Sequence, residues 1–466
     1  MRKIALLITG LSVSVQLLAQ NDDSLFIRRI ANEILLNGRA YDNLRELTKN
    51  IGGRLAGSPN MVKAEKWGQE LLRKTGADKV WLQQCMVPHW VRGGKDEATA
   101  YYLNAPSKGI AVTRVSKPLD VIALGNSLGS GSKAVMADIL EVSSYTELEA
   151  KKDQVKGKIV FYNVKFNSTY IRPFEAYRDA VTYRGSGASA AAQYGALAVI
   201  VRSMSHSTDN NPHTGAMRYI DSLSPNKIPA VAVGLKDADW MDAQLKRGPL
   251  SVSMKTNGHF LPDTIGHNVI GELTGSTYPD QYITVGGHLD SWDPAEGAHD
   301  DGTGIVHTIE IMRAFKALGY QPKHTIRFVL FANEENGGRG GKQYAAEAKA
   351  KNEKHIYALE SDAGGFAPRG FGFEVTDQQF AKIIQWKPLL EPYGAGNLVR
   401  GGDGSDIEPL RETLKTPTSG FLPDPQRYFD YHHARNDVFE NVNKRELELG
   451  AISMAALIYQ VDKNGL

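Results

Sequence analysis

The chain has 466 residues, of which 42% are hydrophobic and 23% charged, a composition ordinary for a globular protein with two or three domains. Its 54 basic and 52 acidic residues give a formal charge of +2, so the overall charge provides no support for nucleic-acid binding. Cys85 is the only cysteine, so the fold has no internal disulfide, and we expect this thiol to be a small packing residue.

The N-terminus has the parts of an export signal. Arg2 and Lys3 form a short positive region, residues 4–18 form an apolar one, and Ala19 ends a segment typical of a signal-peptidase site. A membrane anchor is the alternative, but the apolar run is short and is interrupted by polar residues. We therefore predict a cleaved signal over residues 1–19, a periplasmic or secreted protein, and no stable membrane anchor after cleavage.

Residues 20–117 are predicted to form the first part of the main domain. Helical spacing over residues 24–38 is followed by the turn GGRLAGSPN at 52–60. A second amphipathic helix then carries Val62, Trp67, Leu71 and Leu72.

Residues 118–257 have a different pattern and are predicted to form a small separate α/β domain. Strands are indicated at 155–164 and 228–234, and an Ala-rich helix followed by a strand at 188–204. Because this region has few clustered acids or histidines, we interpret it as a substrate lid or interaction domain. His213 is the one polar residue here that we expect to take part in substrate binding.

From residue 258 to 466, strands and helices alternate. Strands are predicted at 281–290, 324–333 and 355–365, separated by helices at 304–319 and 342–352. The first helix has Ile305, Ile309, Met312 and Phe315 on one face. Such alternation predicts right-handed crossovers and a parallel sheet covered on both sides.

Side chains of the kinds that bind metals follow the three predicted strands. His288 and Asp290 end the first strand, Glu334 and Glu335 follow the second, and Asp362 follows the third. In an open α/β sheet, ligands bind at the carboxyl ends of the strands, so we expect these side chains to lie together.

Two further segments add histidine and aspartate. Asp300 and Asp301 precede the helix at 304–319, and His432, His433 and Asp437 lie close to the C-terminal helix. Each residue alone has an ordinary explanation, such as a hydrogen-bonded histidine, a helix cap or a solvated glutamate. Their coincidence at one edge of a sheet matches the imidazole and carboxylate ligands that Zn²⁺ prefers, and predicts a metal site.

Five segments, GGHLDSWD, GAHDDGTG, FANEENGG, ALESDAGGF and YHHARND, together resemble the motifs of the di-zinc exopeptidases of the bacterial aminopeptidase and glutamate carboxypeptidase group. The resemblance covers nearly all of the chain after about residue 42. It implies an α/β fold of the zinc aminopeptidase (phosphorylase/hydrolase-like) type, with a mixed, mainly parallel sheet flanked by helices. It also implies that residues 118–257 are an inserted protease-associated (PA-like) α/β domain, and that 20–117 and 258–466 form the catalytic domain.

The resemblance implies two Zn²⁺ per chain. His288 and Asp362 would hold one ion, Glu335 and His433 the other, and Asp300 would bridge both. The peptide bond after this bridging aspartate is expected to be cis.

Other residues are expected to act beside the metals. Glu334 would be the general base, and His432, which stands where related enzymes often have tyrosine, is our candidate for stabilising the oxyanion. Three carboxylates are expected behind the ligands: Asp290, which would orient the imidazole of His288, together with Asp301 and Asp437.

The implied activity is hydrolysis of dipeptides or short peptides by a hydroxide that bridges the two metals. Ser405 and Asp406, in GGDGSDIEP, resemble a loop that lines the substrate pocket. Aminopeptidase, dipeptidase and carboxypeptidase activities all occur on such metal centres, so the recognised terminus and side chain stay open. Relatives are often dimers, which makes a homodimer a further expectation.

Two other functions are alternatives. A receptor-like homologue would keep the fold and bind metal without catalysis, although all five ligands and Glu334 are present here. A zinc acyltransferase of the glutaminyl-cyclase type would share the fold with a single zinc, whereas retention of His288 and its carboxylate partners favours two.

Overall fold

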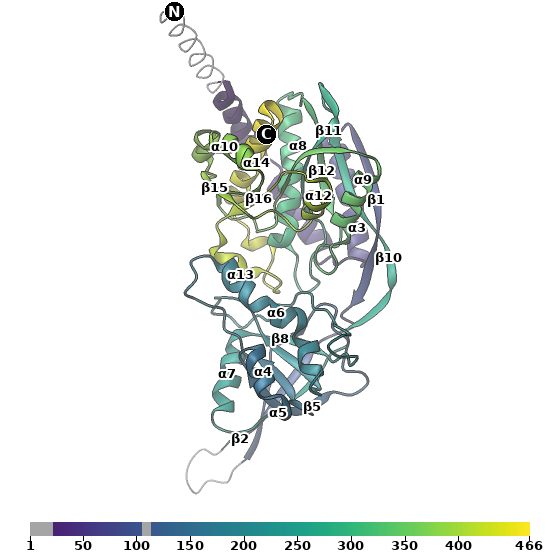
Figure 1. The fold of residues 1–466 in the computed structure, drawn as a ribbon, viewed down its shortest axis with the longest axis vertical. Coiled ribbons are helices and arrows are strands. Elements are labelled where there is room, and N and C mark those ends of the chain that lie inside the picture. The colour runs from purple at the N-terminus through teal and green to yellow at the C-terminus, as the bar shows by residue number, and fades with distance from the viewer. Residues whose placement is uncertain (1–21, 105–112) are drawn as a thin grey trace, which may run out of the picture.

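The computed structural model describes residues 22–104 and 113–466, so the predicted signal over residues 1–19 lies outside the described part of the chain. The chain forms two α/β units, each built around an eight-stranded sheet (Figure 1). Within the described ranges, none of the helices is both long and apolar enough to cross a bilayer.

The first sheet has the strand order β1-β10-β12-β11-β13-β16-β14-β15. Its central strands β12, β11, β13 and β16 are parallel, whereas β1, β10 and β14 are antiparallel to their inner neighbours. The mixed, mainly parallel sheet is therefore confirmed. The strands are β1 (Lys79–Val91), β10 (His259–Leu273), β11 (Tyr278–His288), β12 (His324–Phe331), β13 (Lys354–Glu360), β14 (Pro368–Glu374), β15 (Asn397–Arg400) and β16 (Thr418–Pro423).

Helices cover both faces of this sheet, because successive residues of its buried strands point to opposite sides. Helical residues 22–37 pack on one face with α3 (Pro59–Thr75), α8 (Thr303–Ala317) and α14 (Lys444–Asn464). On the other face lie α9 (Arg339–Ala350) and α12 (Glu408–Leu414). The predicted apolar face of α8 is buried in the first of these cores, as is Cys85.

Short helices complete the first unit. They are α2 (Ala40–Glu46), η1 (Leu47–Ile51), η2 (Ala298–Gly302), α10 (Asp377–Ile384), α11 (Lys387–Leu390), η3 (Glu391–Tyr393), η4 (Pro425–Arg427), α13 (Tyr428–Tyr431) and η5 (Phe439–Asn441).

The second sheet has the order β3-β2-β9-β5-β6-β7-β8-β4. Its strands are β2 (Glu97–Asn104), β3 (Thr113–Leu119), β4 (Val121–Ala123), β5 (Val135–Val142), β6 (Ile159–Tyr162), β7 (Ala198–Arg202), β8 (Ala230–Val233) and β9 (Leu250–Lys255). Apolar cores lie on both of its faces, with α4 (Tyr145–Ala150), α5 (Lys152–Val155), α6 (Pro173–Ala192) and α7 (Leu235–Leu245) around them.

The second unit is inserted between β1 and β10, but it begins earlier in the chain than predicted. The expected boundary at residue 118 falls inside β3, and β2 also belongs to the second sheet because it pairs with β3 and β9. Only residues 92–96 separate β1 from β2, so no linker-like composition marks the crossing. The other expected boundary, at 257, lies between β9 and β10.

Helix α6 is longer than its Ala-rich end predicted, because it already begins at Pro173. Its first half carries aromatic residues, Phe174 and Tyr177, that pack against the first unit rather than in the core of the second, so no simple apolar periodicity marks it. In Figure 1, α6 and α13 lie at the junction between the two units.

Candidate metal centre

Three parallel strands bring the predicted ligands to one edge of the first sheet. Strand β11 ends at His288 and lies between β12, which precedes Glu334 and Glu335, and β13, which precedes Asp362. Because β11 is parallel to both neighbours, their carboxyl ends meet.

Asp300 lies at the middle of the cluster. Its Oδ1 is 3.2 Å from Nε2 of His288, and its Oδ2 is 3.2 Å from Nε2 of His433. The peptide bond Asp300–Asp301 is cis, as the resemblance implied. Each oxygen of one carboxylate therefore faces a different imidazole.

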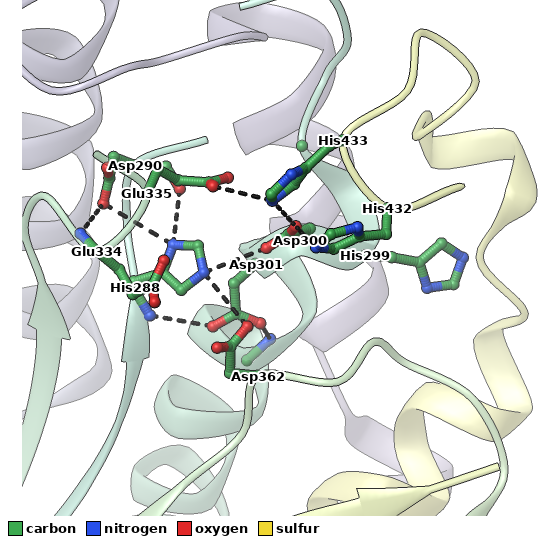
Figure 2. Close-up of polar contacts among 12 residues, drawn as sticks. His288, Asp290, His299, Asp300, Asp301, Glu334, Glu335, Asp362, His432 and His433 are labelled. Atoms are coloured by element: carbon green, nitrogen blue, oxygen red, sulfur yellow. Dashed lines mark hydrogen bonds and ion pairs between the residues drawn. The ribbon is translucent and has the colours of Figure 1, made fainter. Parts of the chain in front are cut away.

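Each imidazole has a second carboxylate beside it. His288 Nε2 lies 3.3 Å from Oδ1 of Asp362, and His433 Nε2 lies 3.1 Å from Oε2 of Glu335. Figure 2 shows the five side chains converging from separate segments, with Asp300 common to both groups.

This donor set fits divalent metal ions. All five side chains are imidazoles or carboxylates, the ligands that zinc takes in catalytic sites. In addition, Oδ2 of Asp300 and Oε1 of Glu335 are buried and have no hydrogen-bond donor among the described residues. A buried carboxylate oxygen without a donor is costly, and a bound cation would compensate it.

The electrostatics of the cluster agree with cation binding. Burial and the neighbouring Asp300 raise the pKa of Glu335 to about 8, although His433 opposes this shift. Burial also raises the pKa of Asp362 to about 6, while His288 acts in the opposite direction. Packing these carboxylates together out of water disfavours their charged forms, and divalent ions would remove that penalty.

Two buried aspartates hold the backbone beneath the ligands. Asp437 accepts the N–H of His299 at 2.7 Å and that of Asp300 at 3.1 Å. Asp301 accepts the N–H of His288 at 3.0 Å and that of Gly304 at 2.9 Å. They fix the ligand-bearing segments through the main chain.

Asp290 acts differently from our expectation. Nδ1 of His288 lies 3.0 Å from the backbone carbonyl oxygen of Asp290, whereas the nearest carboxylate oxygen is 3.8 Å away. The Asp290 carboxylate instead accepts the N–H of Glu334 at 3.0 Å. The imidazole is thus oriented by the main chain, and the carboxylate positions the start of the next segment.

The adjacent glutamates point in different directions. Asn333, just before them, has a φ of +63°, a conformation that asparagine tolerates better than most residues. Glu335 is buried among the ligands, whereas Glu334 is only half-buried and its carboxylate forms no hydrogen bond within the described ranges. Glu334 is therefore the carboxylate left available at the edge of the cluster.

His432 stacks on His433, with ring centroids 3.5 Å apart. Its Nε2 is 3.9 Å from Oδ2 of Asp300. Burial and His433 hold the pKa of His432 well below its usual range, so the ring is neutral.

The residues predicted to bind substrate are scattered. His213 is buried, with neither ring nitrogen hydrogen-bonded among the described residues, and it precedes Thr214, whose N–H donates to the carbonyl of His433 at 3.0 Å. Asp406 is buried, and neither of its carboxylate oxygens has a donor in the described chain. Ser405 is exposed on a surface hollow between α9 and α12, apart from the ligands.

Several residues near the cluster carry no clear signal in the sequence. Arg54 is fully buried and donates to the carbonyls of Leu289, Glu296 and Gly297 at 2.5, 2.8 and 3.1 Å. Its only signal was its place between glycines in GGRLAG.

The inserted unit contributes two further residues that the sequence did not indicate, Arg184 and Tyr177. Arg184 of α6 is 7% exposed, and its Nη1 lies 3.4 Å from Nδ1 of His433. Its Nη2 donates to the hydroxyl of Tyr177 at 2.7 Å. No local sequence pattern distinguishes either residue. Arg184 contacts His433 of the first unit, and it bonds to Tyr177, which lies seven residues earlier in the same helix.

A buried cluster of two imidazoles and three carboxylates at the carboxyl ends of parallel strands, with a carboxylate left available beside it, defines a metal-dependent hydrolase. Comparison with known proteins makes the class more specific. Residues 268–458 match the model of peptidase family M28. Carboxypeptidase Q from Bos taurus is 34% identical over 424 residues, which cover 91% of this chain and 85% of the relative. This chain belongs to peptidase family M28 and is a metallopeptidase, so its substrates are peptides.

Solved structures agree with this assignment. A peptidase M28 precursor from Shewanella amazonensis SB2B is 32% identical and superposes with a TM-score of 0.88, covering 96% of this chain and 98% of that one. A zinc aminopeptidase from Bacillus subtilis is 21% identical, covers 92% of this chain and 95% of that one, and has a TM-score of 0.63, a likeness that concerns the fold.

Proposed function

We propose that this protein is an exported di-zinc exopeptidase that hydrolyses dipeptides or short peptides. The observation that carries the proposal is the position of Asp300, whose two oxygens face His288 and His433 at 3.2 Å each. His288, Asp362 and Asp300 would hold one zinc, and Glu335, His433 and Asp300 the other. One shared carboxylate between two such groups favours two ions over one.

Bound zinc would supply Lewis acidity, polarising the scissile carbonyl and lowering the pKa of the attacking water. Glu334 takes the proton of that water and returns it to the amine that leaves. The half-buried position of Glu334 and its lack of a hydrogen-bond partner among the described residues support this role. Its backbone is held by Asp290, which keeps the carboxylate beside the ligands.

The inserted, PA-like unit is proposed to cover the cleft and to recognise the free carboxyl terminus of the substrate. Arg184 is buried beside His433, and no carboxylate of the described chain lies within ion-pair distance of its guanidinium. Its Nε also has no acceptor there. A buried guanidinium without a counter-ion is costly, and a substrate carboxylate would complete its hydrogen bonds.

The position of Arg184 favours binding of the terminal carboxylate of the substrate rather than of the oxygen of the scissile carbonyl. The guanidinium of Arg184 faces Nδ1 of His433, whereas the carboxylates of Asp300 and Glu335 face Nε2 of the same ring. The site of anion binding is thus displaced from the metals across the imidazole ring. One extended residue spans about 3.5 Å, so the terminal carboxylate of a dipeptide lies about that far beyond its scissile bond.

The test combines a metal count with a substrate panel. Purified protein should contain two zinc ions per chain and cleave free dipeptides, and Glu334→Gln should keep both ions while losing about 10²–10⁴-fold in kcat. Amidated dipeptides should be poor substrates of the wild type. One ion per chain with acyl-transfer activity would support the glutaminyl-cyclase-like alternative, and metal binding without turnover would support a receptor-like one.

A further inference from the structure

Attack of water on a peptide carbonyl moves negative charge onto the carbonyl oxygen, and a protein donor aimed at that oxygen accelerates the reaction. Given the proposed function, one of the groups beside the ligands should be such a donor. His432 and Tyr177 are two of the aromatic side chains with a polar hydrogen that lie there, and Tyr428 and Trp292 are others.

Tyr177 reaches the site from the inserted unit. Its ring meets the ring of His432 edge-on, with centroids 5.2 Å apart. On its other side it stacks on Phe429, with centroids 4.9 Å apart. The ring therefore packs against residues 429–432, the segment that leads directly to His433.

The hydroxyl of Tyr177 accepts one hydrogen bond, and its own hydrogen is available to donate another. Its oxygen accepts from Nη2 of Arg184 at 2.7 Å, and its own O–H has no acceptor among the described residues. A hydroxyl can accept and donate at once, and accepting from a cation makes it a stronger donor. Arg184 thus fixes the oxygen of Tyr177 and leaves its hydrogen for another acceptor.

Tyr177 and Arg184 occupy positions i and i+7 of α6, which places them on one face of the helix. Arg184 also touches His433, so this face is anchored on a metal-ligand residue. Burial raises the pKa of Tyr177, although the charge and hydrogen bond of Arg184 act in the opposite direction, so the hydroxyl stays protonated.

His432 is less suited to the same task. Its Nε2 faces Oδ2 of Asp300 at 3.9 Å, and its ring lies flat against His433. A neutral imidazole has a single N–H to donate, and here the nitrogen on the cluster side already faces a carboxylate.

We propose that Tyr177 of the inserted unit is a catalytic residue whose hydroxyl donates to the scissile carbonyl oxygen as its negative charge develops. Arg184 is its positioning partner and, through its other nitrogens, the group that receives the substrate carboxylate. The catalytic site would then be complete only when both units contribute.

The experiment compares Tyr177→Phe with wild type on a free dipeptide, with zinc content and melting temperature measured on both. We expect kcat to fall about 10²–10³-fold, with KM little changed and two zinc ions retained. Binding of a phosphinic dipeptide, which resembles the tetrahedral state, should weaken by a similar factor. Tyr170→Phe is the matched control, because Tyr170 is exposed and its hydroxyl donates to Asp179.

Two results would overturn the inference. An unchanged kcat in Tyr177→Phe would exclude a role in the reaction. A raised KM with unchanged kcat, seen for free but not for amidated dipeptides, would make Tyr177 part of the carboxylate site instead. If the wild type cleaves no dipeptide at all, the proposed function itself fails, which the wild-type measurement shows separately.

Discussion

The carboxylate of Asp437 holds the backbone of Asp300, accepting its N–H at 3.1 Å through Oδ2. The other oxygen accepts the N–H of His299 at 2.7 Å. Asp437 belongs to the segment that also carries His433, so the two sides of the metal centre are joined behind the ligands as well as through Asp300.

Asp437→Asn should weaken metal binding about 10–100-fold without unfolding the protein. An amide has one acceptor oxygen, so one of the two N–H groups would face an NH₂ group and the Asp300 segment would shift. Competition with a chelator of known affinity measures the change. Asp377→Asn, at a fully exposed carboxylate, is the control and should bind zinc like wild type.

Arg54→Met should destabilise the fold by about 3 kcal/mol, because three buried carbonyls would lose their donor together. Since the carbonyls of Glu296 and Gly297 lie in the loop before Asp300, zinc affinity should fall as well. Arg54→Lys keeps the charge but not the three-way geometry, and should be intermediate. Calorimetric melting with and without zinc checks both effects, and equal stability of Arg54→Met and wild type would contradict the role.

Gly215→Ala should lose most activity. Gly215 has a φ of +128°, and a Cβ there would lie 2.6 Å from the guanidinium of Arg184 and 2.6 Å from Nδ1 of His433. The added methyl would push apart the two units where they meet at the ligand. Gly248→Ala, where a Cβ has no neighbour within 4 Å, provides the control in a kcat/KM comparison.

Glu353 should make the stability of the first unit depend on acid pH. Burial raises its pKa, but hydrogen bonds from His355 and Arg327 outweigh this and lower it from 4.5 to about 2. A carboxylate with a lowered pKa stabilises the fold fully above its unfolded pKa, and this contribution is lost as the pH falls from about 4.5 to about 2.

Glu353→Gln should therefore lower the free energy of unfolding by about 2 kcal/mol at pH 7, allowing for partial solvent screening, and by progressively less below pH 4.5. Melting temperatures measured from pH 7 to pH 3 test this. Glu391→Gln, at an exposed carboxylate paired loosely with Lys387 at 4.0 Å, should show no such convergence. A pH-independent difference would mean that packing, rather than charge, is what the substitution changes.

Much of the metal centre was predictable because it follows from where strands end. His288, Glu335 and Asp362 come directly after buried apolar runs, and parallel neighbours force such ends together. The pairing of Asp300 with both histidines was different. It depends on loops whose spacing carries no period, and only the resemblance to a family suggested it.

The features that were not predicted depend on contacts with residues distant in the sequence. Arg54 donates to backbone carbonyls, which any residue provides, so no complementary charge marks its position. Arg184 and Tyr177 lie on a helix whose environment is another unit of the chain. The start of the second unit was also missed, since β1 continues almost directly into β2.

The contact between Thr214 and His433 runs in both directions, with the Thr214 N–H donating to the His433 carbonyl at 3.0 Å and the Thr214 carbonyl 3.3 Å from Nδ1 of the ring. A shortened chain that joined β1 directly to β10 would keep every metal ligand in its sequence, yet it would leave this imidazole without its support. The inserted unit is therefore not a detachable accessory. A graft that exchanges it between relatives would have to carry this contact with it.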